Sequence, residues 1–354
     1  MGISKPAYVT REAVKSALDV KQTARSDAQV DRAIAAASRA VEALLRRRFY
    51  PELDTRYFDW PNSRSHIPWR LWLDANELIS ITTLTSGGTT ISSSDYFLRR
   101  SDDRDEAPYD QLQLDISTSA VFDSGDTYQK SIAVTGVFGH SAEEEFAGSL
   151  AEALDDSETE LDVTDSSLIG VGDLIKVDSE RMLVTGRAML DTGVTIDASD
   201  SLTERNSDVS IVLSTTTGVP AVGEVVLIDS ERMLVVDKAG TVLTVKRAWD
   251  GSVLASHAAG ASIYAPRTLV VSRAVLGTSA TTHDTGTAVA RHVPPALVSE
   301  LALAYAVNNL LQSQSGYART AGEGENAREF TGRGIRALEK DAFRAHGRIR
   351  LAGV

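Results

Sequence analysis

The sequence predicts an α+β protein: a mainly α-helical core with a small antiparallel β element and an inserted all-β region of two tandem repeated modules. Three observations lead to this fold class. Apolar residues recur at helical spacing at both ends of the chain, and short runs rich in β-branched and aromatic residues fill residues 56–140. A seven-residue segment also occurs twice between residues 141 and 291. The order helix, strand, inserted repeat, helix favours a compact host domain whose two halves meet.

The first fifty residues contain two predicted helices. Thr10 is an N-cap candidate for a short first helix. Ser26 and Gln29 form the S-x-x-Q pattern of a capping box, and the apolar residues that follow fall at 3.6-residue spacing. Arg46–Arg48 are expected to occupy the last turn of this longer helix, where the negative end of the helix dipole favours cations. Phe49-Tyr50-Pro51 closes the helix.

The inserted region contains an internal repeat. The segment Asp178–Val184, which reads DSERMLV, recurs residue for residue at Asp229–Val235, an offset of 51 residues. Each copy shows period-two alternation around polar turns, which is typical of strands. The sequence therefore predicts two tandem β modules, at about 141–209 and 210–291.

Helical patterns return at the end of the chain. Pro294-Pro295 stands where the first turn of a helix tolerates proline, and a last helix is expected to stop at Gly347. The predicted division is 1–140 for the N-terminal part of the core, 141–291 for the insertion, and 292–354 for the C-terminal helices and tail.

Charge is distributed unevenly along the chain. The formal net charge of −13 argues against a protein whose main task is to grip duplex DNA, because phosphate neutralisation needs clustered cations. Residues 1–50 nevertheless carry ten bases and five acids, and residues 328–350 carry seven bases and three acids. Acids crowd the entry to the insertion, from Glu143 to Glu160. The basic helix ends are either surface groups that complement the helix dipole or docking groups for an acidic partner.

No motif in the sequence predicts a catalytic or metal site. The chain has no cysteine, which excludes thiolate nucleophiles and Cys-ligated zinc, and its six histidines form no i, i+4 metal pair and are expected at the surface. Gly139–Ala142 matches the nucleophile elbow G-x-S-x-G only in part, because Glu143 stands where a small residue is needed. Two G-x-G-x-x-A matches, at Gly322 and Gly332, follow no strand and lack the context of a dinucleotide site. We expect no enzyme activity, cofactor or metal, and a hydrolase centred on Ser141 is the weakest alternative.

Several local patterns stand in a fixed order in two parts of the chain, about 1–140 and 292–354. They are Tyr8-Val9-Thr10 before a short helix, Ser26-Asp27 before an Ala-rich helix, Arg47–Pro51 at its end, the strands around Leu71-Trp72-Leu73 and Ile132–Gly139, and Val293-Pro294 before a helix. In these patterns the two parts resemble the head–tail connector (head-completion adaptor) family of tailed bacteriophages. The family commonly joins that last strand directly to that last helix. Here about 150 residues stand between them.

The resemblance implies a virion structural protein of the neck, made in the cytoplasm of the host bacterium. It implies a homo-oligomeric ring, usually of twelve copies, that docks on the portal protein and extends the DNA channel toward a downstream stopper or tail protein. DNA would be only the passing content of the channel, no membrane would be involved, and the insertion would be free to contact the capsid. The alternatives are another neck or tail ring, such as a stopper or tail terminator, or a β-repeat adhesion module on the virion.

Two groups of residues are candidates for docking partners. Portal or partner binding is expected in the C-terminal tail, at Arg333, Arg336, Arg344, Arg348, Ile349, Arg350 and Leu351. Inter-subunit or core docking is expected at the end of the long N-terminal helix, at Arg46, Arg47, Arg48, Phe49 and Tyr50.

Overall fold

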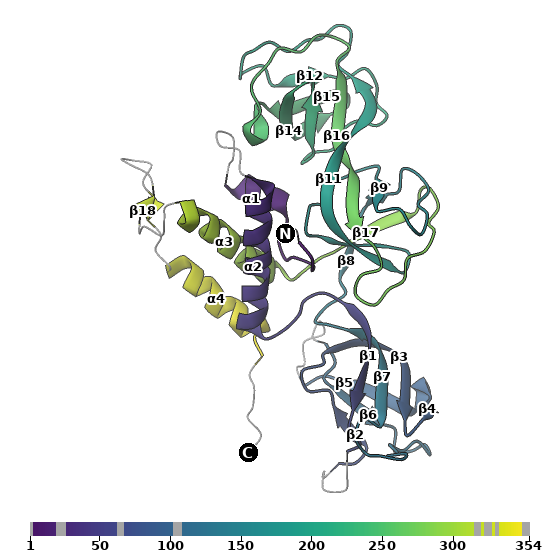
Figure 1. Ribbon diagram of the computed structural model, residues 1–354. Helices are drawn as coiled ribbons and strands as arrows, with labels where there is room; N and C mark the ends of the chain where they lie inside the picture. The colour runs from purple at the N-terminus through teal and green to yellow at the C-terminus, as the bar shows by residue number, and fades with distance from the viewer. Residues whose placement is uncertain are drawn as a thin grey trace.

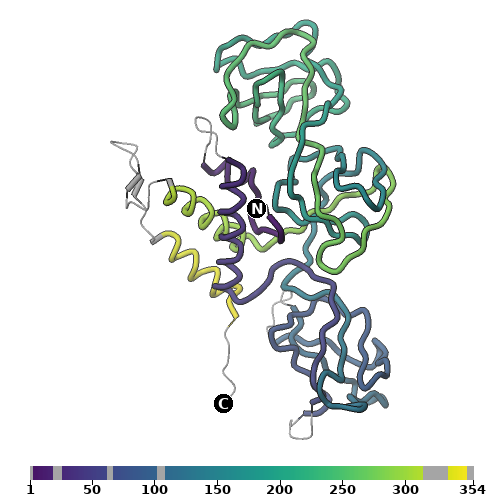
Figure 2. The backbone as a smooth tube through the Cα atoms, in the orientation of Figure 1, coloured from purple at the N-terminus to yellow at the C-terminus, as the bar shows by residue number. Residues whose placement is uncertain are grey.

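The computed structural model of the chain describes residues 3–18, 26–61, 67–101, 108–314, 320–321, 328–329 and 333–348. Its helices gather into one bundle, and three β bodies stand in a row beside this bundle (Figure 1). Figure 2 shows that helices from both ends of the chain meet in the bundle, where the long purple N-terminal helix lies beside the yellow C-terminal helix.

The expectation of a mainly α-helical core is wrong. The chain is about 20% helical and 36% strand. The residues that the structure describes form four helices and three larger antiparallel sheets of four, three and ten strands. The strands expected to decorate a helical core instead enclose a hydrophobic core of their own, and the inserted region forms the largest sheet.

The bundle combines helices from both ends of the chain. It consists of α1 (Arg11–Ala17), α2 (Asp27–Leu45), α3 (Ala296–Gln314) and α4 (Arg333–His346). One face of α2, with Val30, Ile34 and Val41 fully buried, packs against α3, where Val298 and Leu301 are fully buried. The 3.6-residue spacing of the apolar positions in α2 is therefore explained by one continuous helix–helix contact.

The predicted cap of α1 is confirmed, whereas the predicted capping box and last turn of α2 are not. Thr10 caps α1, because its hydroxyl accepts a hydrogen bond from the Ala13 N–H at 3.1 Å. Ser26 begins α2, but its hydroxyl makes no capping hydrogen bond, so the predicted capping box does not form. The helix ends at Leu45 because Arg46 adopts the left-handed conformation (φ 57°, ψ 36°). The three arginines therefore follow α2 instead of filling its last turn.

Residues 52–138 form a separate body, here called the β lobe. One sheet has the order β1-β7-β3-β4 and the other β2-β6-β5, and both contribute to one core that includes Leu71, Leu78, Leu112 and Val134. The strands are β1 (Glu52–Phe58), β2 (Arg70–Trp72), β3 (Leu78–Ser86), β4 (Thr89–Ile91), β5 (Tyr96–Arg99), β6 (Gln111–Leu114) and β7 (Ile132–Phe138).

The inserted region is one ten-stranded antiparallel sheet that curls around two cores. The sheet follows the order β12-β15-β14-β13-β16-β11-β10-β17-β8, and β9 pairs with β16. The strands are β8 (Glu144–Ser149), β9 (Glu160–Asp162), β10 (Leu174–Val177), β11 (Glu180–Thr195), β12 (Ser210–Val212), β13 (Val225–Ile228), β14 (Glu231–Ala239), β15 (Val242–Lys246), β16 (Ser262–Ser272) and β17 (Ala288–His292).

The two repeated modules are nested, not tandem. The long strands β11 and β16 pair from Leu183↔Ser272 to Thr195↔Ser262 and so run through both modules. The outer module comprises residues 144–190 and 265–292, and the inner module comprises residues 191–264. The β14–β15 hairpin of the inner module closes at its tip, whereas the equivalent pair in the outer module, β11 and β16, continues into the inner module. A tandem division would cut both cores.

The outer module also completes the core of the bundle. Its Val171, Leu174 and Leu183 pack with the buried residues of α2 and α3. The N-terminal segment fastens the contact, because the Ala7 N–H donates to the Gly172 carbonyl at 2.9 Å. The Glu12 carboxylate accepts a hydrogen bond from the Val171 N–H at 2.8 Å. The outer module is therefore packed onto the bundle, and the inner module projects beyond it (Figure 1).

Candidate functional site

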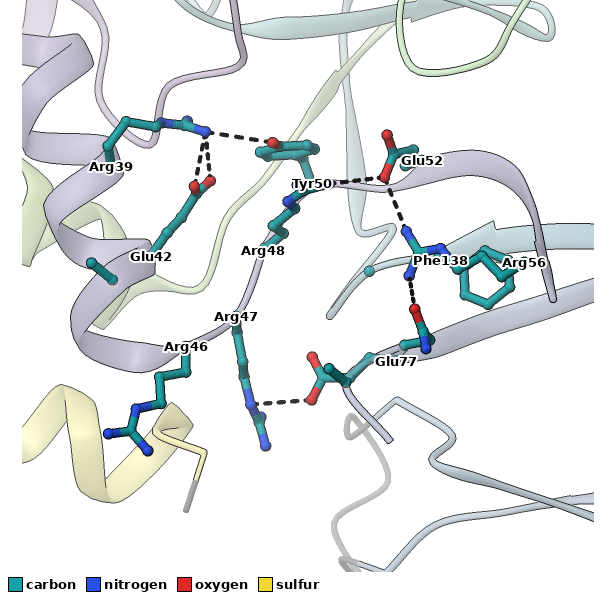
Figure 3. Close-up of a pocket in the computed structure, with 14 residues that line it drawn as sticks. Arg39, Glu42, Arg46, Arg47, Arg48, Tyr50, Glu52, Arg56, Glu77 and Phe138 are labelled. Atoms are coloured by element: carbon teal, nitrogen blue, oxygen red, sulfur yellow. Dashed lines mark hydrogen bonds and ion pairs between the residues drawn. The ribbon is translucent and has the colours of Figure 1, made fainter. Parts of the chain in front are cut away.

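A cleft of about 630 Å³ lies where the end of α2 meets the β lobe (Figure 3). Arginine dominates its wall, and we call it the arginine cleft after Arg39, Arg46, Arg47, Arg48 and Arg56. Three glutamates also line it, at Glu42, Glu52 and Glu77. The five arginines and three glutamates leave an excess of two positive charges when all are ionised. The N-terminal docking candidates Arg46–Tyr50 thus lie in or beside this cleft.

The backbone after α2 spreads the three consecutive arginines in different directions. Arg46 turns the chain out of the helix while its N–H still donates to the Glu42 carbonyl at 2.7 Å. In Figure 3 the Arg46 side chain lies on the α4 side of the cleft, Arg47 reaches toward Glu77, and Arg48 lies toward Glu52. Because the turn points each side chain to a different wall, one short segment provides positive charge to the whole cleft.

Most of the cleft arginines are held by acids. Arg47 Nε lies 3.1 Å from Glu77 Oε1, and Arg39 Nη1 lies 2.8 Å from Glu42 Oε1. Glu52 lies 3.1 Å from Arg48 Nη1, whose side chain is 54% exposed. Among the described residues, no carboxylate forms an ion pair with the exposed Arg46 side chain. The cleft therefore combines positioned arginines with positive charge that an acidic ligand could neutralise.

Glu77 makes the charge of the cleft depend on pH. Its side chain is almost fully buried directly before β3, and burial raises its pKa above the usual range. The positive charges of Arg47 and Arg348 oppose this effect without cancelling it. Protonation of Glu77 removes one of the three negative charges, so the cleft becomes more positive as the pH falls.

Phe49 and Tyr50 lie at a junction of the bundle, the β lobe and the outer module. Phe49 is fully buried; its N–H donates to the Tyr8 hydroxyl at 3.1 Å, and its carbonyl lies 2.7 Å from His292 Nε2. Its ring meets the ring of His140 edge-on, with centroids 5.0 Å apart. Tyr50 is 3% exposed and stacks on Tyr8. These two candidates therefore contact elements of their own chain.

The C-terminal candidates are spread along and beyond α4. Arg336 and Arg344 are exposed on its surface, and Arg344 lies 3.8 Å from Asp341. The Arg348 N–H donates to the Leu45 carbonyl at 3.1 Å, which joins the end of α4 to the end of α2. The side chain of Arg333 and all of Ile349, Arg350 and Leu351 lie outside the described residues. Of the described C-terminal candidates, Arg348 comes closest to the cleft, where its charge acts on Glu77.

Two buried polar networks, one in each module, are not predicted by any single motif of the sequence. In the outer module, Arg273 makes two hydrogen bonds of 2.7 Å to the carboxylate of Glu180. His283 lies between Glu180 Oε2 at 3.0 Å and Asp178 Oδ2 at 2.7 Å. Burial of Glu180 would raise its pKa, but the hydrogen bonds from Arg273 and His283 outweigh burial and lower the pKa to about 2.

The inner module repeats this network atom for atom. Arg247 bonds Glu231 at 2.8 and 2.7 Å, and His257 lies 3.0 Å from Glu231 and 2.7 Å from Asp229. The expectation that the histidines lie at the surface is therefore wrong for His257 and His283, which are nearly fully buried with a carboxylate facing each ring nitrogen. It is also wrong for His140 and His292, which are buried at the junction around Phe49.

A second, gapped repeat in the sequence indicates these two networks. Arg247-Ala248 with Gly251, His257 and Gly260 recurs at the same spacing as Arg273-Ala274 with Gly277, His283 and Gly286. Along the chain the order is first DSER copy, second DSER copy, inner Arg–His pair, outer Arg–His pair. Each module needs one DSER segment and one Arg–His pair. The order along the chain is therefore the one expected if one module is inserted into the other.

Ser141, the candidate nucleophile of the hydrolase alternative, makes a local contact. The Ser141 hydroxyl accepts a hydrogen bond from the Glu143 N–H at 3.1 Å, which is a local turn contact. No group of three or more metal-ligating side chains gathers within the described ranges. None of the described helices is long and apolar enough to cross a membrane. Comparison with known proteins found no matching family model, no matching curated protein and no matching solved structure.

Proposed function

We propose that the protein is a head-to-tail adaptor of a tailed bacteriophage. In this proposal it is a structural protein of the virion neck that forms a homo-oligomeric ring, docks on the portal protein and extends the DNA channel toward the downstream stopper or tail protein. Its role is to bind partners, without a chemical reaction, cofactor or metal.

The main support for the proposal is that the segments that resemble the connector family meet at Phe49. Tyr8 from the N-terminal segment bonds the Phe49 N–H, and His292, directly before Val293-Pro294, bonds the Phe49 carbonyl. The Gly139 N–H at the end of the β7 strand donates to the Glu77 carbonyl, and the His140 N–H donates to the Arg48 carbonyl. Segments far apart in sequence thus form one junction, as expected if they belong to one folded unit that is interrupted by an insertion.

A second observation concerns the surface of the β lobe. On the outward face of the β2-β6-β5 sheet, Trp72 and Phe97 are 51% and 48% exposed, and Arg70 and Arg99 lie beside them. Strand alternation places Gln111 and Gln113 on this face too, so its six outward residues include no carboxylate and no lysine. Exposed aromatic residues with arginine are typical of protein–protein interfaces. This face is suited to a partner in the neck.

The test is binding to the portal ring of the same phage, measured by analytical ultracentrifugation with the full chain. We expect a complex heavier than the portal ring alone, and weaker binding for Arg336→Glu/Arg344→Glu because both side chains are exposed on α4. A matched control is Lys238→Glu on the inner module, far from α4, which should bind like the wild type. No complex with the portal, but a complex with the downstream tail protein alone, would contradict the adaptor role and favour a stopper or tail terminator.

A further inference from the structure

The outer module carries an exposed acidic loop between β8 and β9. Residues 152–160 include five acids and no base, and all five acids are exposed: Glu152, Asp155, Asp156, Glu158 and Glu160. Within the described residues, Glu152, Asp156 and Glu160 form no ion pair with a base of their own chain. The loop therefore presents exposed negative charge, of which only Asp155 and Asp156 lie within electrostatic range of a described base, Arg273.

The buried network of the outer module holds this loop in one conformation. Arg273, fixed by Glu180, donates to the carbonyls of Asp155 at 2.7 Å and Glu158 at 3.0 Å. Buried Leu154 anchors the loop, because its N–H donates to the His283 carbonyl at 2.9 Å. A loop that is already ordered loses little conformational entropy when a partner binds it.

The inner module shows that the fold itself does not require the acids. Its Arg247 holds the equivalent loop in the same way, through the carbonyls of Thr203 at 3.2 Å and Asp208 at 3.0 Å. The equivalent residues 200–210 nevertheless contain three acids and one base, so that loop carries less negative charge. The same scaffold thus carries five acids without a base in one copy and mixed charges in the other, so the fold alone does not account for the acidity of residues 152–160.

We infer that the acidic loop, residues 152–160, binds in the arginine cleft of a second copy of this chain. The cleft has an excess of positive charge and an exposed Arg46 without a described acidic partner, and the loop has the opposite charge on a fixed backbone. Complementary charge of this kind fixes the orientation in which two surfaces meet.

The two surfaces cannot meet within one chain as it is folded. β9, where the acidic loop ends, lies on the side of the outer module that faces away from α2, whereas the cleft lies between α2 and the β lobe (Figure 1). A contact between two different surfaces of identical chains is heterologous, and repeated contacts of this kind close into a ring or extend into a filament. This inference names the subunit contact of the ring and so rests on the proposed function.

The test is the self-association of the full-length protein, measured by sedimentation velocity at increasing concentration. We expect the wild type to self-associate, and Arg46→Glu/Arg48→Glu or Glu152→Lys/Asp156→Lys to weaken self-association by about tenfold or more, because two attractive pairs become repulsive. The matched control, Glu204→Lys/Asp237→Lys, changes the charge equally on exposed inner-module acids and should associate like the wild type. Circular dichroism checks that each variant is folded.

The decisive variant carries both charge reversals in one chain. Because the two substituted loop positions are then positive and the two substituted cleft positions are negative, these pairs attract again, and self-association should recover. The inference is overturned if the wild type is a monomer at every concentration, if the cleft or loop variants associate like the wild type, or if the combined variant stays monomeric. Portal binding by the wild type would still support the proposed function in each of these cases, so the two can fail separately.

Discussion

Replacement of Arg247 by methionine should unfold the inner module while leaving the outer module folded. The Arg247 side chain is fully buried and bonds both oxygens of Glu231, at 2.8 and 2.7 Å, as well as the carbonyls of Thr203 and Asp208. Methionine fills similar space without charge, so the carboxylate of Glu231 stays buried without its cation. Removal of one partner of a buried ion pair costs about 3–5 kcal/mol.

The effect should be local because the two modules have separate hydrophobic cores. Hydrogen–deuterium exchange with mass spectrometry should show lost protection in residues 191–264, whereas residues 174–184 keep theirs. The matched variant Arg273→Met should give the reverse pattern and also release the acidic loop. Lys238→Met, at an exposed position of β14, is the control and should change stability by about 0.5 kcal/mol or less. A loss below about 1 kcal/mol for Arg247→Met would contradict this prediction, because a buried carboxylate that has lost its arginine should cost more than that.

Three further predictions follow from the fold. Deletion of residues 191–264, with β11 and β16 joined by a tight turn, should leave a cooperatively folding protein by calorimetry, whereas loss of the transition would contradict the nested arrangement. Burial raises the pKa of Asp173 to about 7, with Arg291 opposing it, so the folded chain holds a proton that the unfolded chain has released between about pH 4 and 7. The free energy of unfolding should therefore fall as the pH rises through this window, and urea titrations of Asp173→Asn should show a smaller fall; an equal fall would be evidence against it. Gly277→Ala should lower the melting temperature more than Gly240→Ala, because both have positive φ but only at Gly277 would a Cβ lie against the Leu53 carbonyl; equal shifts would count against this contact.

Features of the fold that depend only on residues close together in the sequence could be predicted. The apolar spacing of α2 and the Thr10 cap of α1 depend on neighbouring residues, and the structure contains both. The end of α2 could not be predicted as accurately. It depends on the left-handed conformation of Arg46, and arginine has no preference for that conformation. The short strands of residues 52–138 were recognisable, but strand patterns do not show whether they pack on helices or enclose a core of their own.

The parts of the site that could not be predicted from the sequence depend on contacts between distant segments. The exact repeat DSERMLV was visible, whereas its partner segments match only at Arg, Ala, Gly and His positions and were not recognised as a second repeat. Buried His283 and Arg273 therefore could not be paired with Glu180, which lies about a hundred residues earlier. The basic cluster at 46–48 can be recognised from the sequence, but two acids that share its cleft, Glu52 in β1 and Glu77 directly before β3, come from later in the chain, and only the folded chain shows that they meet.

The central claim is that this protein forms a ring on a portal, and electron cryo-microscopy of the full-length protein mixed with the portal ring of the same phage tests it most directly. The account predicts a second, coaxial ring below the portal, with the bundle at the portal and the inner modules projecting from it. Particles that show only bare portal rings, at concentrations where the protein is in excess, would contradict it.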